Sequence, residues 1–293
     1  MQQYYIGKEQ SEIEILSSNT ELENKIFIND GLDKEIEYNN ISCSRITFSK
    51  ISFNNIKITK SLFNHCVFIG CYFNKSTLQH IDFKNCTFIE CEFNSMNISN
   101  CNFFYTNWKS TYIKFNELKK SLPSKHNHRS RLCKVMAQNC INDGNIAEYK
   151  KYFLESIKAR EEQYLSIILR NEGFYSQNYT QIDSIKNIFK LFKSKFSGYA
   201  WGHGESITKI LLSSIFNVII FAHIYLYSEV ISNLSSGRFI NALYVSFCNF
   251  LTISSDITFS ENFFRYITII EGFTGIIFAG LFVTVLFKKI NTR

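Results

Sequence analysis

Apolar residues form two long runs near the end of the chain and a regular pattern nearer its start. The two runs are Ile207–Tyr227 and Tyr266–Phe287. Each contains about 20 residues, and a helix of that length rises about 30 Å, the thickness of the hydrocarbon core of a bilayer. We therefore expect two transmembrane helices, at residues 207–227 and 266–287.

A third apolar stretch, residues 239–256, lies between the two runs. Its large apolar positions are Phe239, Ile240, Leu243, Tyr244, Phe247, Phe250 and Leu251. It is too short to cross a bilayer, which is typical of a segment that enters the membrane and returns on the same side. The pattern predicts a two-span module over residues 206–293 with a re-entrant pore loop. The alternative is a two-helix anchor with an external loop.

Between residues 41 and 115, apolar side chains recur every five residues over fifteen consecutive units. The third residue of each unit is large and apolar, the first is small or of medium size, and the others are mostly polar. Neither the helical nor the strand period fits this spacing. Units that bury their apolar residues against neighbouring units form one continuous core. The phenylalanines expected in this core are Phe48, Phe53, Phe63, Phe68, Phe73, Phe83, Phe88, Phe93 and Phe103.

The five-residue pattern resembles the pentapeptide-repeat family. The resemblance implies a right-handed, four-sided β-solenoid with about four units per coil, whose first and third residues point inward. Some members of that family imitate duplex DNA through an acidic surface. Here the outward positions are mainly basic, so no nucleic-acid-related role is expected. Two roles stay open for the solenoid: a rigid scaffold, or the sensing of a ligand or partner.

Residues 116–205 are expected to form a cytosolic helical connector. The turn Asn142–Asn145 separates two helices, and the second extends to Arg170. Near the end of the connector, residues 183–196 place apolar side chains at helical spacing, with lysines mostly elsewhere on the helix. A basic amphipathic helix directly before a span is typical of the membrane interface. The alternative is packing against the connector. The residues that define this interfacial helix are Phe189, Phe192, Lys190 and Lys193.

Charge divides the chain unevenly. Residues 1–40 contain nine Asp and Glu against three Lys, which makes them strongly acidic in a chain of net charge +7. This segment is expected to be disordered or to cap the solenoid. Basic residues precede the first run and follow the second, whereas only Arg238 and Arg265 lie between them. The positive-inside rule therefore places both termini in the cytoplasm. The start of the chain has no apolar signal-peptide core.

Cysteine and histidine suggest structural roles. Six of the nine cysteines lie at inward positions of the five-residue units, which predicts reduced thiols in a buried stack rather than disulfides. His126, His128 and Cys133 could bind a metal, but no fourth ligand has the required spacing. A solvated basic turn is a better interpretation of this stretch than a metal site. We expect no metal site, no cofactor and no catalytic constellation, and hence no enzyme.

The two-span module resembles the potassium-channel pore. Asn241–Phe247 matches the pore helix of that family. Thr252-Ile253 and Asp256 match the ends of its filter, which reads Thr-Val-Gly-Tyr-Gly-Asp. The segment Ile269–Gly275 is similar to the start of its inner helix. The pore filter expected here is Thr252, Ile253, Ser254, Ser255 and Asp256, and the expected bending points of the inner helix are Gly272 and Gly275.

The resemblance implies four-fold assembly around a re-entrant pore. It does not imply potassium selectivity, because two serines stand where the family has Gly-Tyr-Gly, and the filter is one residue short. Glu271 is costly in lipid and is expected to face protein or water as a brace for the pore helix. Bacterial proteins that join pentapeptide repeats to such a module are a known combination, so the resemblance extends over most of the chain.

The sequence thus predicts a homotetrameric, cation-permeable ion channel of a bacterial inner membrane. Its partners would be membrane lipid, monovalent cations and other copies of the chain. The solenoid would scaffold the pore or gate it in response to an unknown cytosolic signal or protein. The alternatives are a membrane-anchored scaffold that does not conduct, and a stress or antiphage effector that permeabilises the membrane.

Overall fold

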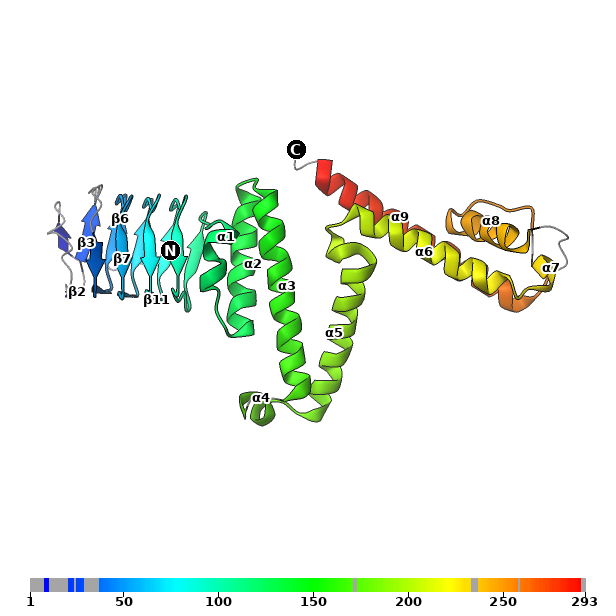
Figure 1. Cartoon of the computed structure of the whole chain (residues 1–293), viewed down its shortest axis with the longest axis horizontal. Helices are drawn as coiled ribbons and strands as arrows, with labels where there is room; N and C mark the ends of the chain where they lie inside the picture. The colour runs from blue at the N-terminus through cyan, green and yellow to red at the C-terminus, as the bar shows by residue number, and fades with distance from the viewer. Residues whose placement is uncertain are drawn as a thin grey trace. The chain divides into compact units, whose positions relative to one another are not determined.

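The structure is a computed structural model that describes residues 8–10, 21–23, 25–28, 37–170, 173–232, 237–257 and 259–290. The chain divides into two compact units, residues 1–185 and 186–293, and each is described by itself. The first holds the strands and a helical cap, and the second holds the two long apolar helices (Figure 1).

The first unit is a stack of short parallel strands (Figure 1). The strands are β1 Lys8–Gln10, β2 Glu21–Glu23, β3 Lys25–Ile28, β4 Glu37–Asn39, β5 Ser42–Ser44, β6 Thr47–Ser49, β7 Lys57–Thr59, β8 Leu62–Asn64, β9 Val67–Ile69, β10 Thr77–Gln79, β11 Asp82–Lys84, β12 Thr87–Ile89, β13 Asn97–Ser99 and β14 Asn107–Lys109. They form three parallel sheets, in the orders β1-β3-β6-β9-β12-β14, β13-β10-β7-β4 and β11-β8-β5-β2. Isolated bridges such as Ser52 to Tyr72 and Tyr72 to Glu92 make the fourth side.

The register gives the length of a coil. Phe48 pairs with Phe68, and Phe68 pairs with Phe88, so each coil advances by twenty residues, or four five-residue units. The predicted parallel β-solenoid is confirmed. The ladders also extend before residue 41, because β2, β3 and β4 pair with β5, β6 and β7. β1 in turn pairs with β3. Apart from these four strands and Asn40, the residues of the acidic N-terminal segment lie outside the described part of the chain.

Each corner of the solenoid is made by the fifth residue of a unit. These residues adopt positive φ angles close to 55°, as in Arg45, His65 and Asn85 with φ of 54°, 54° and 53°. This left-handed conformation turns the chain at the corner, so that the next strand begins on the adjacent side of the four-sided coil. Glycine is the residue that adopts it most easily, but among the corners that the structure describes between residues 40 and 110, only Gly70 is a glycine. The corner is therefore imposed by the ladder rather than by the local sequence.

The core is a column of rings. The third residues of the units are buried, and successive coils stack them face to face: Phe53 and Phe73 have centroids 4.8 Å apart, and Phe73 and Phe93 also 4.8 Å apart. Trp108 ends one such column on Phe88, at 4.3 Å. The nine expected core phenylalanines are all buried. Burial of this aromatic surface stabilises coils only when they are stacked.

The first residues of the units line the core beside the rings. All nine cysteines are free and buried. The thiol of Cys101 donates to the Leu78 carbonyl oxygen at 3.3 Å. Burial raises the pKa of the Cys101 thiol to about 11, so at neutral pH it stays protonated and poorly nucleophilic. These thiols act as small apolar residues with a weak donor.

Helices close the end of the solenoid that follows β14. They are α1 Phe115–Leu118, the 3-10 turn η1 Lys119–Ser121, α2 His126–Asn142, α3 Ile146–Leu169 and α4 Gly173–Asn178. One hydrophobic core runs from the coils into α2 and α3. Asn139 donates to the Thr111 carbonyl oxygen at 2.7 Å, and Tyr152 donates to that of Ile113 at 2.6 Å. Backbone groups that the next coil would have satisfied are thus paired with the cap.

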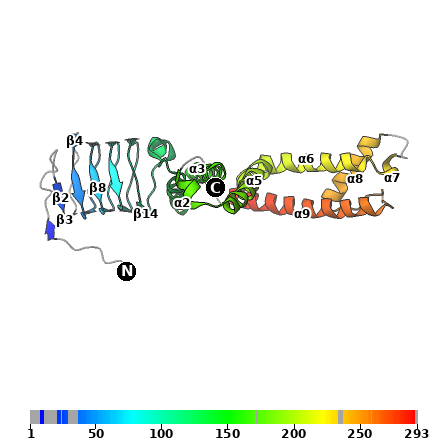
Figure 2. The ribbon, with the colours of Figure 1, turned by 90° about the horizontal axis from the view of Figure 1, so that it is seen from below.

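The second unit contains the two long apolar helices. Its elements are α5 Gln181–Trp201, which begins in the first unit, the 3-10 turn η2 Gly202–Gly204, α6 Ile207–Tyr225, α7 Glu229–Ser232, α8 Arg238–Phe250 and α9 Asn262–Ile290. Both α6 and α9 are long and apolar enough to cross a membrane. They run antiparallel, and α8 packs against both of them (Figure 2).

The turn between α5 and α6 requires glycine. Gly202, His203 and Gly204 have φ angles of 59°, 55° and 80°, three left-handed residues in succession. A Cβ atom at Gly202 would also lie 2.8 Å from the Ser206 Cβ atom. Substitution there would force the turn to move.

Candidate ion-conduction site

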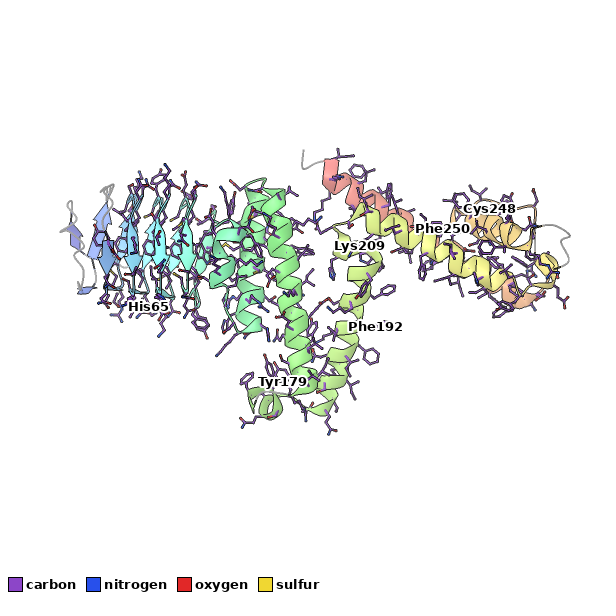
Figure 3. The ribbon with its side chains drawn as sticks, in the orientation of Figure 1. His65, Tyr179, Phe192, Lys209, Cys248 and Phe250 are labelled. Atoms are coloured by element: carbon purple, nitrogen blue, oxygen red, sulfur yellow. The ribbon has the colours of Figure 1, made fainter. Side chains whose placement is uncertain are left out.

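The short helix α8 buries one face against the spanning helices and leaves the other open. Its buried side chains are Ala242, Val245, Ser246 and Cys248. Large apolar side chains are exposed along the opposite stripe: Phe239, Ile240, Tyr244, Phe247 and, at its end, Leu251. Figure 3 shows Cys248 and Phe250 near the end of this helix. The stripe has the spacing of one helix face, and a single chain leaves it exposed.

The expected filter segment begins where α8 ends. Thr252 has φ of 58°, a left-handed conformation that is costly for a β-branched residue. The Thr252 amide donates to the Asn249 carbonyl oxygen at 3.0 Å, and the Ile253 amide donates to that of Cys248 at 2.8 Å. These bonds satisfy the last carbonyls of the helix. The strained residue is therefore held by its own helix end.

The rest of the segment is open in a single chain. Thr252, Ile253, Ser254 and Asp256 are exposed, and Ser255 is half-buried with its hydroxyl donating to the Ile257 carbonyl oxygen at 2.9 Å. The five expected filter residues are thus contiguous and accessible, and one of the serine hydroxyls is already paired within the chain.

Glu271 of α9 is fully buried, and it joins three helices. Tyr225, at the end of α6, donates its hydroxyl to Glu271 Oε2 at 2.7 Å, and Ser246 of α8 contacts Glu271 Oε1. Asn249 of α8 donates to the Tyr225 hydroxyl at 3.2 Å. The Ser246 hydroxyl also lies 2.8 Å from the Val218 carbonyl oxygen of α6. A buried carboxyl group with these partners resists separation of the helices, because each partner left alone would be buried and unsatisfied.

The two glycines of α9 differ in their surroundings. A Cβ atom at Gly275 would lie 1.9 Å from the Phe250 carbonyl oxygen, which no packing allows. At Gly272 the nearest atom, the Asn249 carbonyl oxygen, would lie 3.5 Å away, an ordinary contact. The helix is continuous through both positions. In this conformation Gly275 serves as the surface on which the end of α8 rests, and bending at either glycine stays a prediction.

Sequence reasoning identified Glu271 but missed its partners Tyr225, Ser246 and Asn249. One signal was present: Ser246 and Asn249 are polar, are three residues apart and lie opposite the aromatic stripe of α8. A polar pair on the buried face of a membrane-embedded helix indicates a hydrogen-bonded contact.

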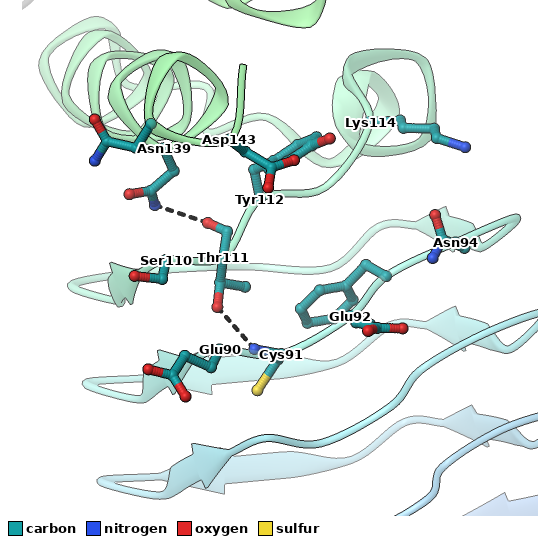
Figure 4. Close-up of a pocket in the computed structure, with 12 residues that line it drawn as sticks. Glu90, Cys91, Glu92, Asn94, Ser110, Thr111, Tyr112, Lys114, Asn139 and Asp143 are labelled. Atoms are coloured by element: carbon teal, nitrogen blue, oxygen red, sulfur yellow. Dashed lines mark hydrogen bonds between the residues drawn. The ribbon is translucent and has the colours of Figure 1, made fainter. Parts of the chain in front are cut away.

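A separate polar pocket lies in the first unit, between the last coils and α2 (Figure 4). It has a volume of about 530 Å³. Its acidic and basic side chains are Glu90, Glu92, Lys114 and Asp143. Its floor is held by Thr111, whose hydroxyl accepts from the Cys91 amide at 2.9 Å. The pocket lies beside the solenoid, the domain for which the sequence left a sensing role open.

Comparisons with known proteins agree with this division of the chain. Pentapeptide repeats are recognised at residues 66–103, in eight copies, and an ion channel domain at residues 213–292. Among solved structures, a pentapeptide repeat protein from the cyanobacterium Cyanothece 51142 matches 34% of this chain and 87% of its own, with 10% identity and a TM-score of 0.27. No curated protein matches the chain. The chain is thus a fusion of pentapeptide repeats, folded as a β-solenoid, with a two-span potassium-channel-like ion channel domain.

Proposed function

We propose that this chain forms a homotetrameric ion channel of a bacterial inner membrane that prefers cations over anions. One observation carries the proposal: a short helix, α8, is held between two spanning helices and delivers an exposed polar segment, residues 252–256, at its end. A loop outside the membrane would not be expected to make buried contacts with both spans, as α8 does through Glu271 and its partners.

Assembly is supported by apolar surface that a single chain leaves uncovered. Besides the stripe of α8, a mainly apolar groove of about 500 Å³ runs between α6 and α8, lined in part by Ile219, Leu243 and Phe247. Neighbouring copies placed around an axis would cover the stripe of α8 and bring their filter segments together. Closed cyclic symmetry is the usual arrangement of such assemblies.

Orientation follows from charge at the ends of the helices. Lys288 of α9 contacts Glu205, just before α6, so the basic end of α9 lies beside the start of α6. Lysines of α5 precede this point. The positive-inside rule then gives both ends of the chain a cytoplasmic location, and the solenoid would act in the cytoplasm as a scaffold or as a gating domain.

Weak selectivity among cations follows from the filter. Without glycine, the segment from Thr252 to Asp256 lacks the backbone freedom that a stack of inward carbonyl oxygens requires. A ring of four exposed Asp256 carboxylates would concentrate cations and repel anions.

The number of copies can be measured by native mass spectrometry of the detergent-solubilised protein. We expect four copies, and any other number would exclude the four-fold pore.

Asp256→Asn tests the origin of cation preference. We expect conductance to fall most at low ionic strength, where charges are least screened. Under opposing potassium and sodium solutions, the wild-type reversal potential should lie near zero. A value near the potassium equilibrium potential would exclude weak selectivity. If Asp256 instead braces the pore structurally, Asp256→Asn would abolish current at every salt concentration.

A further inference from the structure

Helix α5 exposes an apolar stripe along most of its length. Six large side chains on one side of it are between 50% and 80% exposed. They are Ile185, Ile188, Phe189, Phe192, Phe196 and Tyr199. At 100° per residue these positions fall within about one third of the helix circumference. Within the second unit, none of the described residues covers them.

The other sides of α5 have a different character. Asn187 is buried, and Leu191 and Ser194 are half-buried on the side opposite the stripe. Exposed lysines border the stripe: Lys186 and Lys193 on one edge and Lys195 on the other. Lys190 is exposed too, but it lies farther round the helix, away from the stripe. The helix therefore has a protein-facing side, a bare apolar side and a basic border between them.

The end of α5 is fixed to the ends of both spanning helices. Lys209 of α6 donates to the Gly198 carbonyl oxygen at 2.7 Å, and Ser213 donates to that of Ala200 at 2.5 Å. A cation at the carboxyl end of a helix also interacts favourably with its dipole. Glu205, in the turn after α5, contacts Lys288 at the end of α9. These contacts place the end of α5 level with the basic ends of the two spans.

The direction of α5 completes the geometry. Within the second unit α5 runs across the direction of α6 and α9, and Figures 1 and 2 agree on this. Phe192 points from α5 toward the side to which the two spans extend (Figure 3). A helix that crosses the spans at their ends, with its apolar side turned the same way as the spans, lies parallel to the membrane plane.

We propose that residues 185–199 of α5 bind the surface of a bilayer that contains anionic lipid. The phenylalanine side chains enter the boundary between headgroups and acyl chains, and the bordering lysines contact lipid phosphates. The sequence pattern predicted such a helix; the exposed stripe, the contacts that fix its end and the direction of Phe192 are independent structural support. Conduction through the pore is not required for this contact.

A pair of labelled variants tests the proposal. The nine native cysteines are buried, so Phe192→Cys and Lys190→Cys each give one accessible thiol for an environment-sensitive fluorophore on the full chain. The two positions lie about 160° apart on the helix, which makes Lys190→Cys the matched control. The protein is reconstituted in vesicles of phosphatidylcholine alone or with phosphatidylglycerol.

We expect the label at position 192 to emit at shorter wavelength than the label at 190 and to be quenched by lipids that carry a nitroxide on the acyl chain. We expect this quenching to increase when phosphatidylglycerol is present. The label at 190 should be quenched by aqueous iodide instead. Equal iodide quenching at both positions would overturn the proposal. So would a label at 192 that is shielded from iodide but not reached by the lipid quencher, because protein would then cover the stripe. Equal lipid quenching in the two vesicle types would refute the requirement for anionic lipid.

Discussion

The solenoid and the two-span unit distribute polar and apolar groups in opposite ways. In the solenoid the rings are inside, with Phe73 only 2% exposed, and polar residues face outward. In the second unit Glu271 and Ser246 are fully buried, whereas Phe216 is 65% and Ile269 68% exposed. The first unit completes its core with its own chain, capped by α2 and α3. The second is complete only when lipid or other copies surround it, as expected for a bilayer-embedded domain.

The largest expected effect comes from a charge in the ring column. Phe73→Asp would bury a carboxylate between Phe53 and Phe93 with no partner, and we expect the loss of more than about 4 kcal/mol of folding free energy. Thermal unfolding of the full chain in detergent, followed by circular dichroism, measures it. Tyr72→Asp is the matched control, because Tyr72 is the preceding residue and is 42% exposed. Equal melting of both variants and the wild type would show that the rings do not point inward.

The second effect concerns the polar core of the spanning unit. Glu271→Leu removes the acceptor of the buried Tyr225 hydroxyl and one of the two partners of the Ser246 hydroxyl, and we expect a loss of about 2–4 kcal/mol. Glu271→Gln keeps a side chain of the same shape that can still accept from Tyr225, and should cost less. The midpoint of thermal dissociation of the complex in detergent reports both. A leucine variant at least as stable as the glutamine variant would mean that the network does not hold α8 in place.

Substitutions of the two glycines of α9 are expected to differ in their effects. Gly275→Ala drives a methyl group against the Phe250 carbonyl oxygen, and the required shift should cost about 1–3 kcal/mol and displace the filter segment. Gly272→Ala meets only ordinary contacts and should melt close to the wild type. Melting and single-channel conductance of the two variants provide the comparison. If Gly272→Ala were the more damaging, α9 would use that glycine for bending rather than Gly275 for packing.

The smallest effect is a pH dependence in the solenoid. Burial raises the pKa of the Cys101 thiol from 9.0 to about 11. The unfolded chain therefore releases the proton first, so the contribution of this thiol to stability is complete below about pH 9 and falls as the pH rises to about 11. Cys101→Ser should remove this part of the alkaline decline, since Ser61 and Ser76 occupy the same position in their units. Identical pH profiles for variant and wild type would show that Cys101 does not titrate on unfolding.

The fold of the solenoid was predictable because its sequence period equals its structural period. Most units place one ring, such as Phe48 or Phe68, at the same inward position. The pairing register of each coil therefore follows directly from the five-residue count. The strands before residue 41 were harder to predict, because their spacing departs from five: Phe27 pairs with Phe48, twenty-one residues later. Backbone pairing continues there although the pattern weakens.

The site in the second unit was predictable only in outline. Length and hydropathy indicated the spans and the short helix α8. The contact between Gly275 and Phe250, and the partners of Glu271, depend on how three helices meet, which a linear pattern does not specify. The left-handed Thr252 runs against its own local preference and is imposed by the end of α8. Such conflicts between local preference and structure concentrate at functional segments.

The most direct test of the central claim is single-channel recording of the purified full chain in a planar bilayer that separates two KCl concentrations. A conducting pore lined by Asp256 should give discrete openings with a reversal potential displaced toward the potassium equilibrium potential, since chloride is repelled. A current that reverses near the chloride potential would contradict cation preference. A silent bilayer containing correctly assembled protein would contradict conduction itself and favour a membrane-anchored scaffold.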